Sequence, residues 1–175
     1  MNRANVAAEK TMPGRNIQEL NPRAWPDRVR SCPGIKQIKI NEYIKQRLEV
    51  TSVTKNVYDV LLINKKGLIT EGSRSNFFLV KGEKIYSAKG NLILPGITRK
   101  YVISAANNLN IEIVEKELKL MEIKDYEAAF LSGTSPKVLP VKKIDNCHFK
   151  TNHPVLRMIR EEFDEIYNSY INSRI

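Results

Sequence analysis

Apolar residues follow two different patterns along this chain of 175 residues, and the change comes near Gly34. Residues 1–33 contain half of the prolines and keep no sustained apolar period of the helix or the strand type. Trp25 is the single large apolar anchor in this stretch. The pattern predicts an irregular or disordered lead-in, or a remnant, over residues 1–33 and one folded domain over residues 34–175.

Strands are expected where short apolar or alternating runs are bounded by turn residues. The expected strands span residues 35–40, 57–64, 68–70, 77–81, 84–87, 111–117, 128–131 and 138–144. The second and third should pair across Lys65-Lys66-Gly67, and the fourth and fifth should form a hairpin across Gly82-Glu83.

Helical periodicity predicts three helices and one helical turn, over residues 42–50, 98–109, 152–171 and 119–125 respectively. Thr98 is expected to cap the second helix, while Thr151 or Asn152 caps the last one and Pro154 occupies its first turn. Each of these two helices has one apolar face. The mixture of strands and helices predicts an α/β to α+β fold.

Composition is that of an ordinary soluble domain, with 42% hydrophobic and 27% charged residues. No apolar run reaches the length of a membrane-spanning helix, and the first thirty residues lack a signal-peptide core, so cytoplasmic residence is expected. Cys32 and Cys147 are interpreted as unpaired thiols of a reducing compartment. His148 and His153 have no partners at ligand spacing, so no metal site is expected.

The net charge of +10 raises the hypothesis of a nucleic-acid partner. However, the lysines are spread along the chain without a block of five or aromatic interleaving. A solvated basic surface is therefore favoured over a polynucleotide-binding face. The same surface would also attract an anionic cofactor or a dicarboxylate substrate.

Lys36 is the first candidate for chemistry. A strand over residues 35–40 places it on one face with Ile38 and Ile40. Desolvation beside apolar neighbours lowers the pKa of a lysine and exposes a neutral amine, as Schiff-base chemistry requires. The alternative is a lysine whose stem lies on apolar surface while its ammonium reaches water. Taken alone, the pattern favours this alternative.

Glu71 lies in a Gly/Ser turn between two strand-like runs, where it is half-withdrawn from water. Beside a pyridine ring, its carboxylate would keep the ring nitrogen protonated. The alternative is a turn acid that accepts nearby backbone N–H bonds or pairs with Arg74. Taken alone, the alternative is favoured.

Two segments have the features of an anion cradle. Pro95-Gly96 leads into a helix whose first N–H groups, on Ile97 and Thr98, can bind a phosphate. Ser132-Gly133-Thr134-Ser135 follows an apolar strand and can form a second nest of N–H groups. Each is ordinary turn chemistry when taken alone, but acid, lysine and cradle together suggest pyridoxal phosphate.

Together these segments resemble the class IV, or fold-type IV, pyridoxal-phosphate enzymes, which include branched-chain aminotransferases, D-amino-acid aminotransferases and aminodeoxychorismate lyases. The resemblance runs from about Gly34 to Ile144. It is carried by the order and spacing of Ile35-Lys36, residues 70–77 (Thr-Glu-Gly-Ser-Arg-Ser-Asn-Phe), residues 94–99 (Leu-Pro-Gly-Ile-Thr-Arg) and Ser132-Gly133-Thr134. It implies the family's large domain, a pseudo-barrel with surrounding helices.

The resemblance also implies the cofactor, pyridoxal 5'-phosphate, and a role for each matched residue. Lys36 would form the Schiff base and move the proton between substrate and cofactor carbons. Glu71 would hold the pyridinium. The phosphate would be bound by Ile97, Thr98 and Thr134, and the loop containing Ser73 and Ser75 would line the cofactor.

The chain departs from the family pattern at three points. Residues 1–33 do not resemble the smaller domain that normally precedes the lysine strand, and its loss would expose an apolar face and favour a homodimer. Asn41 stands where branched-chain members have a tyrosine, and Lys39 where many relatives have asparagine.

The main hypothesis is an amino-acid aminotransferase, of the branched-chain or D-amino-acid type, that acts on an amino acid and a 2-oxo acid. The turn Glu-Gly-Ser-Arg-Ser-Asn lacks the acidic second half usual in branched-chain enzymes, which slightly favours the other branches. The first alternative is an aminodeoxychorismate lyase. The second is a truncated, catalytically impaired member of the family. No nucleic-acid or membrane partner is expected.

Overall fold

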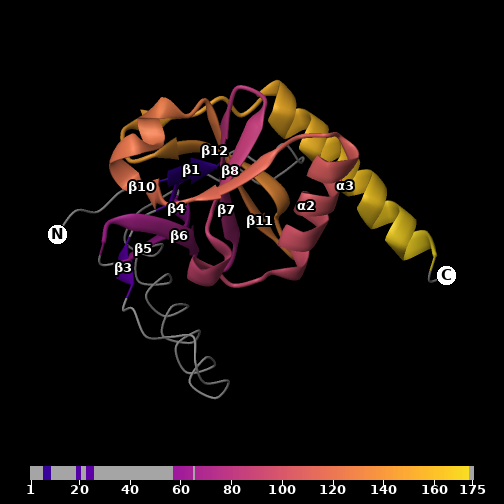
Figure 1. Ribbon diagram of the computed structural model, residues 1–175, viewed down its shortest axis with the longest axis horizontal. Coiled ribbons are helices and arrows are strands. Elements are labelled where there is room, and N and C mark those ends of the chain that lie inside the picture. The colour runs from indigo at the N-terminus through magenta and orange to yellow at the C-terminus, as the bar shows by residue number, and fades with distance from the viewer. Residues whose placement is uncertain (1–5, 9–18, 21–22, 26–56, 65, 174–175) are drawn as a thin grey trace, which may run out of the picture.

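The computed structural model describes residues 6–8, 19–20, 23–25, 57–64 and 66–173. The strand expected over residues 35–40, the helix expected over residues 42–50, and Lys36 lie outside these described residues. Figure 1 shows curled strands at the centre of the molecule and two helices side by side along one flank.

The largest sheet has seven strands in the order β1-β12-β11-β7-β8-β9, and β13 pairs with β12. Neighbouring strands are antiparallel except β8 and β9, which run parallel. The strands are β1 (Val6–Ala8), β7 (Asn76–Lys81), β8 (Lys84–Ala88), β9 (Ile113–Lys116), β11 (Ala128–Gly133), β12 (Lys137–Ile144) and β13 (Cys147–His148).

A second sheet has four strands in the order β10-β6-β5-β3, and β2 pairs separately with β4. These strands are β2 (Glu19–Leu20), β3 (Arg23–Trp25), β4 (Val57–Asp59), β5 (Leu61–Asn64), β6 (Leu68–Gly72) and β10 (Leu118–Lys119). Because β6 ends in this sheet and β7 begins in the larger one, residues 73–75 carry the chain from one sheet to the other.

The pair β7 and β11 is buried on both faces. Phe77 and Leu79 pack in the core shared with the second sheet, whereas Phe78 and Val80 pack in the core under the helices. Phe78 stacks on Phe130 of β11 with ring centroids 4.7 Å apart. Burial on both faces explains why these strands are continuous apolar runs rather than alternating ones.

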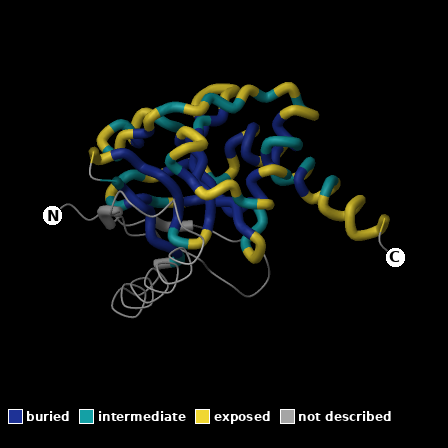
Figure 2. The backbone as a smooth tube through the Cα atoms, turned by 60° about the horizontal axis from the view of Figure 1, so that its bottom comes forward, coloured by how far each residue is buried: buried dark blue, intermediate teal, exposed yellow. Residues whose placement is uncertain are grey.

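Helices α2 (Ile97–Asn108) and α3 (Pro154–Asn172) cover one face of the large sheet (Figure 1). Their buried side chains are Val102, Ala105, Ala106, Val155, Leu156, Ile159 and Phe163. Tyr101 meets Phe163 edge to face between the helices, with centroids 6.3 Å apart. The last turns of α3 are exposed (Figure 2). Among the described residues, no helix combines the length and the apolar character needed to cross a membrane.

Most of the expected elements within the described residues are confirmed to within a few residues. Both turns form, so β5 pairs with β6 and β7 pairs with β8. Gly67 and Gly82 have φ of 74° and 56°, the left-handed conformation that glycine adopts at no steric cost. The expected helical turn is the 3₁₀ helix η2 (Leu120–Asp125), and a second one, η1 (Gly90–Leu92), precedes α2.

The single strand expected over residues 57–64 is wrong, because the chain divides at Val60 into β4 and β5. The N–H of Val60 donates to Asp59 Oδ1 at 2.8 Å, and its carbonyl accepts the N–H of Ser73 at 2.8 Å. Both backbone groups of Val60 are thus bonded outside a ladder, which ends one strand and starts the next.

The expected caps are also wrong. Gly96, in an extended conformation, is the N-cap of α2, and its carbonyl accepts the first helical bond from Lys100 at 3.3 Å, so Thr98 lies inside the helix. His153 is the N-cap of α3 in place of Thr151 or Asn152. The ring of Pro154 disfavours a helical conformation at the residue before it, which fixes this start.

The partly buried carboxyl of Asp145 should make the stability of the fold depend on pH. Asp145 joins β12 to β13 with φ of 51°, and burial raises the pKa of its carboxyl to about 6, although Lys143 acts in the opposite direction. The folded state therefore holds this proton to higher pH than the unfolded chain. Ionising the buried carboxyl costs folding free energy. The stability that the protonated carboxyl contributes is therefore lost as pH rises from about 4 to 6.

Asp145→Asn should therefore stabilise the chain near pH 7 by about 1 kcal/mol, a figure reduced for solvent screening of a partly exposed carboxyl. Near pH 4 the difference should disappear, because the parent side chain is then protonated. Urea unfolding of both proteins at the two pH values measures this. An equal difference at both values would mean that the backbone conformation, not the charge, is responsible.

Candidate functional site

Glu71 lies near the end of β6 and is buried, with 8% of its surface exposed. Its Oε2 accepts the backbone N–H of Leu94 at 2.9 Å and the side-chain amide of Asn76 at 3.3 Å. The pairing partner suggested by sequence, Arg74, is exposed. The carboxylate is thus fixed against the segment that leads into α2.

Asn76, the first residue of β7, joins Glu71 to that segment. Its amide also donates to the carbonyl of Leu94 at 2.9 Å. Its Oδ1 lies so close to Gly96 that a Cβ added there would be 2.5 Å away. In the sequence, Asn76 belongs to the motif over residues 70–77, and its position directly after the Ser turn is the signal for its role.

The start of α2 has the features of an anion site. No side chain in the described part of the chain caps this helix, and its first turn, from Ile97 to Lys100, contains no acidic residue. The N–H groups of the first turn have no partner within the helix, and the helix dipole favours negative charge there. The side chain of Ile97 is exposed, whereas that of Thr98 is buried.

The turn after β11 reaches the same end of the sheet. Ser132 is the register partner of Asn76, and a Cβ on Gly133 would lie 3.4 Å from the carbonyl oxygen of Arg74. Thr134 follows in the turn and is exposed. Among the described residues, the buried hydroxyl of Ser132 has no hydrogen-bond partner. The structure therefore brings this turn beside the loop that follows Glu71.

Ser73 and Ser75 face a residue that sequence analysis missed, Asp59. Ser75 donates its hydroxyl to Asp59 Oδ2 at 2.9 Å, and Ser73 donates to Asp59 Oδ1. Asp59 is 2% exposed. A single acid inside the apolar run 57–63 was the signal in the sequence, because its partners lie 14 and 16 residues away.

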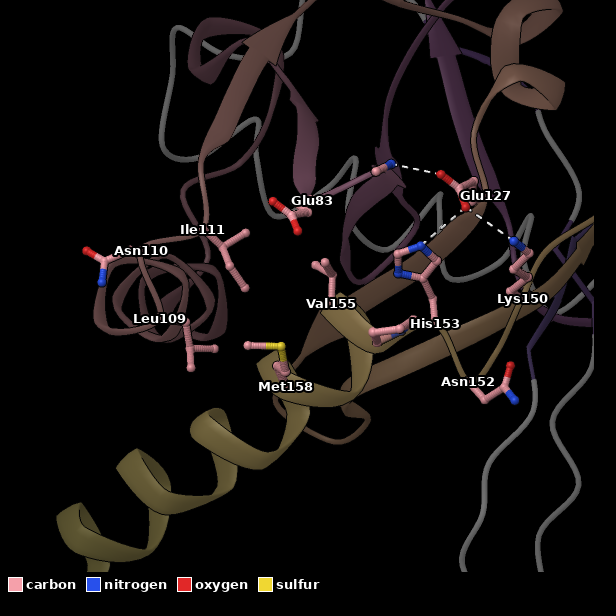
Figure 3. A pocket seen from close by; sticks show the side chains of 12 residues that line it. Glu83, Leu109, Asn110, Ile111, Glu127, Lys150, Asn152, His153, Val155 and Met158 are labelled. Atoms are coloured by element: carbon pink, nitrogen blue, oxygen red, sulfur yellow. Dashed lines mark hydrogen bonds and ion pairs between the residues drawn. The ribbon is translucent and has the colours of Figure 1, made fainter.

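A cavity of about 670 Å³ lies elsewhere, at the start of α3 and the β7–β8 turn (Figure 3). Lys150 and His153 point toward Glu127, with separations of 3.2 and 3.5 Å. The N–H of Gly82 and the Lys150 ammonium hold the pKa of Glu127 below its ordinary value. None of the site residues expected from sequence lines this cavity.

The chain is similar to known proteins over much of its length. The family model "Amino-transferase class IV" matches residues 6–144. The "Probable branched-chain-amino-acid aminotransferase" of Thermotoga maritima is 32% identical over 154 residues, 86% of this chain and 55% of that protein. The protein of the same name from Rickettsia bellii is 34% identical over 111 residues, 62% of this chain and 38% of that protein. The chain thus spans about half of these relatives' length, or less.

Two solved structures share the fold. A T.th. branched-chain amino acid aminotransferase, complexed with N-(5'-phosphopyridoxyl)-L-glutamate, is 28% identical, with 72% of this chain and 42% of that chain covered and a TM-score of 0.64. A Legionella pneumophila protein with a provisional assignment as 4-amino-4-deoxychorismate lyase is 26% identical, with 73% and 47% covered and a TM-score of 0.62. The expected mixed fold of fold-type IV enzymes is confirmed, and the chain belongs to the class IV aminotransferase family.

Proposed function

We propose that this chain is the pyridoxal-phosphate-binding part, over residues 34–175, of an amino-acid aminotransferase. The observation that carries the proposal is the buried carboxylate of Glu71, bonded to the segment that opens α2. An acid and an anion-binding helix start, held together by Asn76, are the two fixed groups that a phosphorylated pyridine requires.

The donor set fits this cofactor. The N–H groups of Ile97 and Thr98 would hold the phosphate with the hydroxyl of Thr134, and no acid in the first turn of α2 opposes the anion. Glu71 would hold a proton on the ring nitrogen from within a buried, hydrogen-bonded position. When bound, the cofactor supplies an electron sink for charge developing on the substrate carbon.

Lys36 is the proposed point of covalent attachment and the residue that moves the proton at the substrate carbon. The loop with Ser73 and Ser75 is proposed to line the cofactor. The enzyme would react first with an amino acid and then with a 2-oxo acid. The names of the relatives favour branched-chain amino acids. The proposal includes a homodimer in the cytoplasm. The exposed apolar side chains of Leu94 and Ile97, beside the site, support a covering partner surface.

The second candidate is an aminodeoxychorismate lyase, which the Legionella relative favours. The lyase would release pyruvate from aminodeoxychorismate without an amino acceptor, whereas the transaminase requires a 2-oxo acid. This one assay separates the two. A chain that binds the cofactor but performs neither reaction would be the catalytically impaired member.

The full chain mixed with pyridoxal phosphate should develop a visible absorbance band that borohydride removes while labelling Lys36. Lys36→Ala should lack the band. Lys39→Ala, on the opposite face of the expected strand, is the matched control and should keep it. Peptide mapping that finds the label scattered over surface lysines would overturn the assignment of Lys36.

Glu71→Gln should keep the bond from the N–H of Leu94 and remove the charge. Unfolding free energy should change little, whereas cofactor binding should weaken and transamination should slow at least about tenfold, because a neutral amide does not hold the protonated ring. Single-turnover kinetics measure the loss. Unchanged turnover in a correctly folded variant would exclude this role for Glu71.

Gly96→Ala should weaken pyridoxal phosphate binding at least about tenfold, because the new Cβ must displace either Asn76 or the start of α2. Gly90→Ala is the matched control, since its Cβ would meet its nearest neighbour, Glu115 Oε2, at an ordinary 3.5 Å. Fluorescence titration gives both affinities. Equal affinities would show that the Gly96 contact has no part in binding.

A further inference from the structure

Asp59 is a buried carboxylate that the proposed chemistry does not use. It ends β4, and among the described residues its two oxygens accept from donors on Val60, Ser73 and Ser75. Oδ1 accepts the N–H of Val60 and the hydroxyl of Ser73, and Oδ2 accepts the hydroxyl of Ser75. A buried acceptor without donors costs free energy. The hydrogen bonds from Ser73 and Ser75 therefore hold the loop against the Asp59 carboxylate.

Two backbone bonds close the same loop. Gly72 donates its N–H to the carbonyl of Ser75 at 2.8 Å, and Ser73 donates to the carbonyl of Val60 at 2.8 Å. Gly72 has no room for a side chain, because a Cβ would overlap Ser75 Oγ and lie 2.9 Å from Asp59 Oδ2. The loop is therefore packed directly onto Asp59.

The ends of this loop are the two residues on which the candidate site depends. Glu71 precedes Gly72, and Asn76 follows Ser75. A change in the loop's conformation can move the carboxylate of Glu71 relative to the amide of Asn76, and the two groups are 3.3 Å apart. The loop also spans the two sheets, so the packing of side chains does not define its conformation as it would within one sheet.

The same bonds determine what the hydroxyls can offer a ligand. Because Ser73 and Ser75 both donate their protons to Asp59, their oxygens present only lone pairs to any other group. The loop would thus accept a hydrogen bond from a ligand and would not donate one from these hydroxyls.

We propose that Asp59 is a positioning residue: it fixes the conformation of the Gly72–Ser75 loop, and thereby the separation of Glu71 and Asn76, without touching the cofactor. The effect on the loop follows from the structure alone. Only its consequence for cofactor binding rests on the proposed function.

Hydrogen exchange of the cofactor-free full chain, followed by mass spectrometry, tests the effect on the loop. Asp59→Asn keeps one acceptor oxygen, so at least one of the three donors loses its partner. Amides of residues 72–76 should exchange at least about tenfold faster. Because the lost bond is also absent from the unfolded chain, the denaturant midpoint should fall, but the amides of β11 should remain protected. Asp164→Asn, which removes an exposed acid paired with Lys137, is the matched control and should leave the loop unchanged.

A second pair of variants keeps the test valid if Asp59→Asn fails to fold. Ser73→Ala with Ser75→Ala retains Asp59 and removes both hydroxyl donors, and it should give the same local acceleration. Ser73→Thr alone retains a hydroxyl and should keep the parent's exchange rates over residues 72–76 in the cofactor-free chain. Loop exchange equal to the parent in both the Asp59→Asn and the double serine variant would overturn the proposal.

Titration with pyridoxal phosphate separates this inference from the proposed function. If the parent binds the cofactor, Asp59→Asn, which changes no residue proposed to line it, should bind at least about tenfold more weakly while it remains folded. Equal affinity together with faster loop exchange would overturn the positioning role. If the parent does not bind, the proposed function fails, and loop exchange still decides whether Asp59 fixes the loop.

Discussion

The chain crosses from a four-stranded sheet to a seven-stranded sheet in three residues, and a buried acid holds that crossing in place. Asp59 accepts the hydroxyls of Ser73 and Ser75, while Gly72 leaves no space between them. The two cores lie on the two faces of β7, the strand that begins at this crossing. A short connection between sheets tolerates few conformations, and hydrogen bonds to a carboxylate select one of them.

The same crossing explains why the candidate site lies at the end of the large sheet. Strand β7 begins there, β11 ends there in register with it, and α2 starts beside them after η1. Glu71 and Leu94, in the segment that leads into α2, are 23 residues apart, and Asn76 joins them through its side chain. A site built from strand and helix ends keeps its groups in position because the two buried cores hold those ends.

Elements that depend on local pattern were predictable from sequence. The unbroken apolar runs Phe77–Val80 and Ala128–Leu131 predict strands, and burial on both faces explains why these runs do not alternate. Gly82 predicts the turn between β7 and β8. The caps were not predictable from residue type alone. Thr98 is a good capping residue, yet Gly96 begins α2 because the chain is extended there and packs against Asn76. Preference at a cap is worth about 1 kcal/mol, which a tertiary contact readily outweighs.

The sequence by itself determined most of the helices and strands described after residue 56 and the tight glycine turns, but not β1, β2 and β3, which pair with β12, β4 and β5. The elements so determined follow from hydrophobic period and backbone preference, which act between residues close along the chain. The tertiary structure alone decided the division of the chain at Val60, the pairing of Ser132 with Asn76 and the burial of Asp59 among its serine donors. Each depends on which distant residues become hydrogen-bond partners. The local sequence around a buried acid does not specify where its donors lie along the chain.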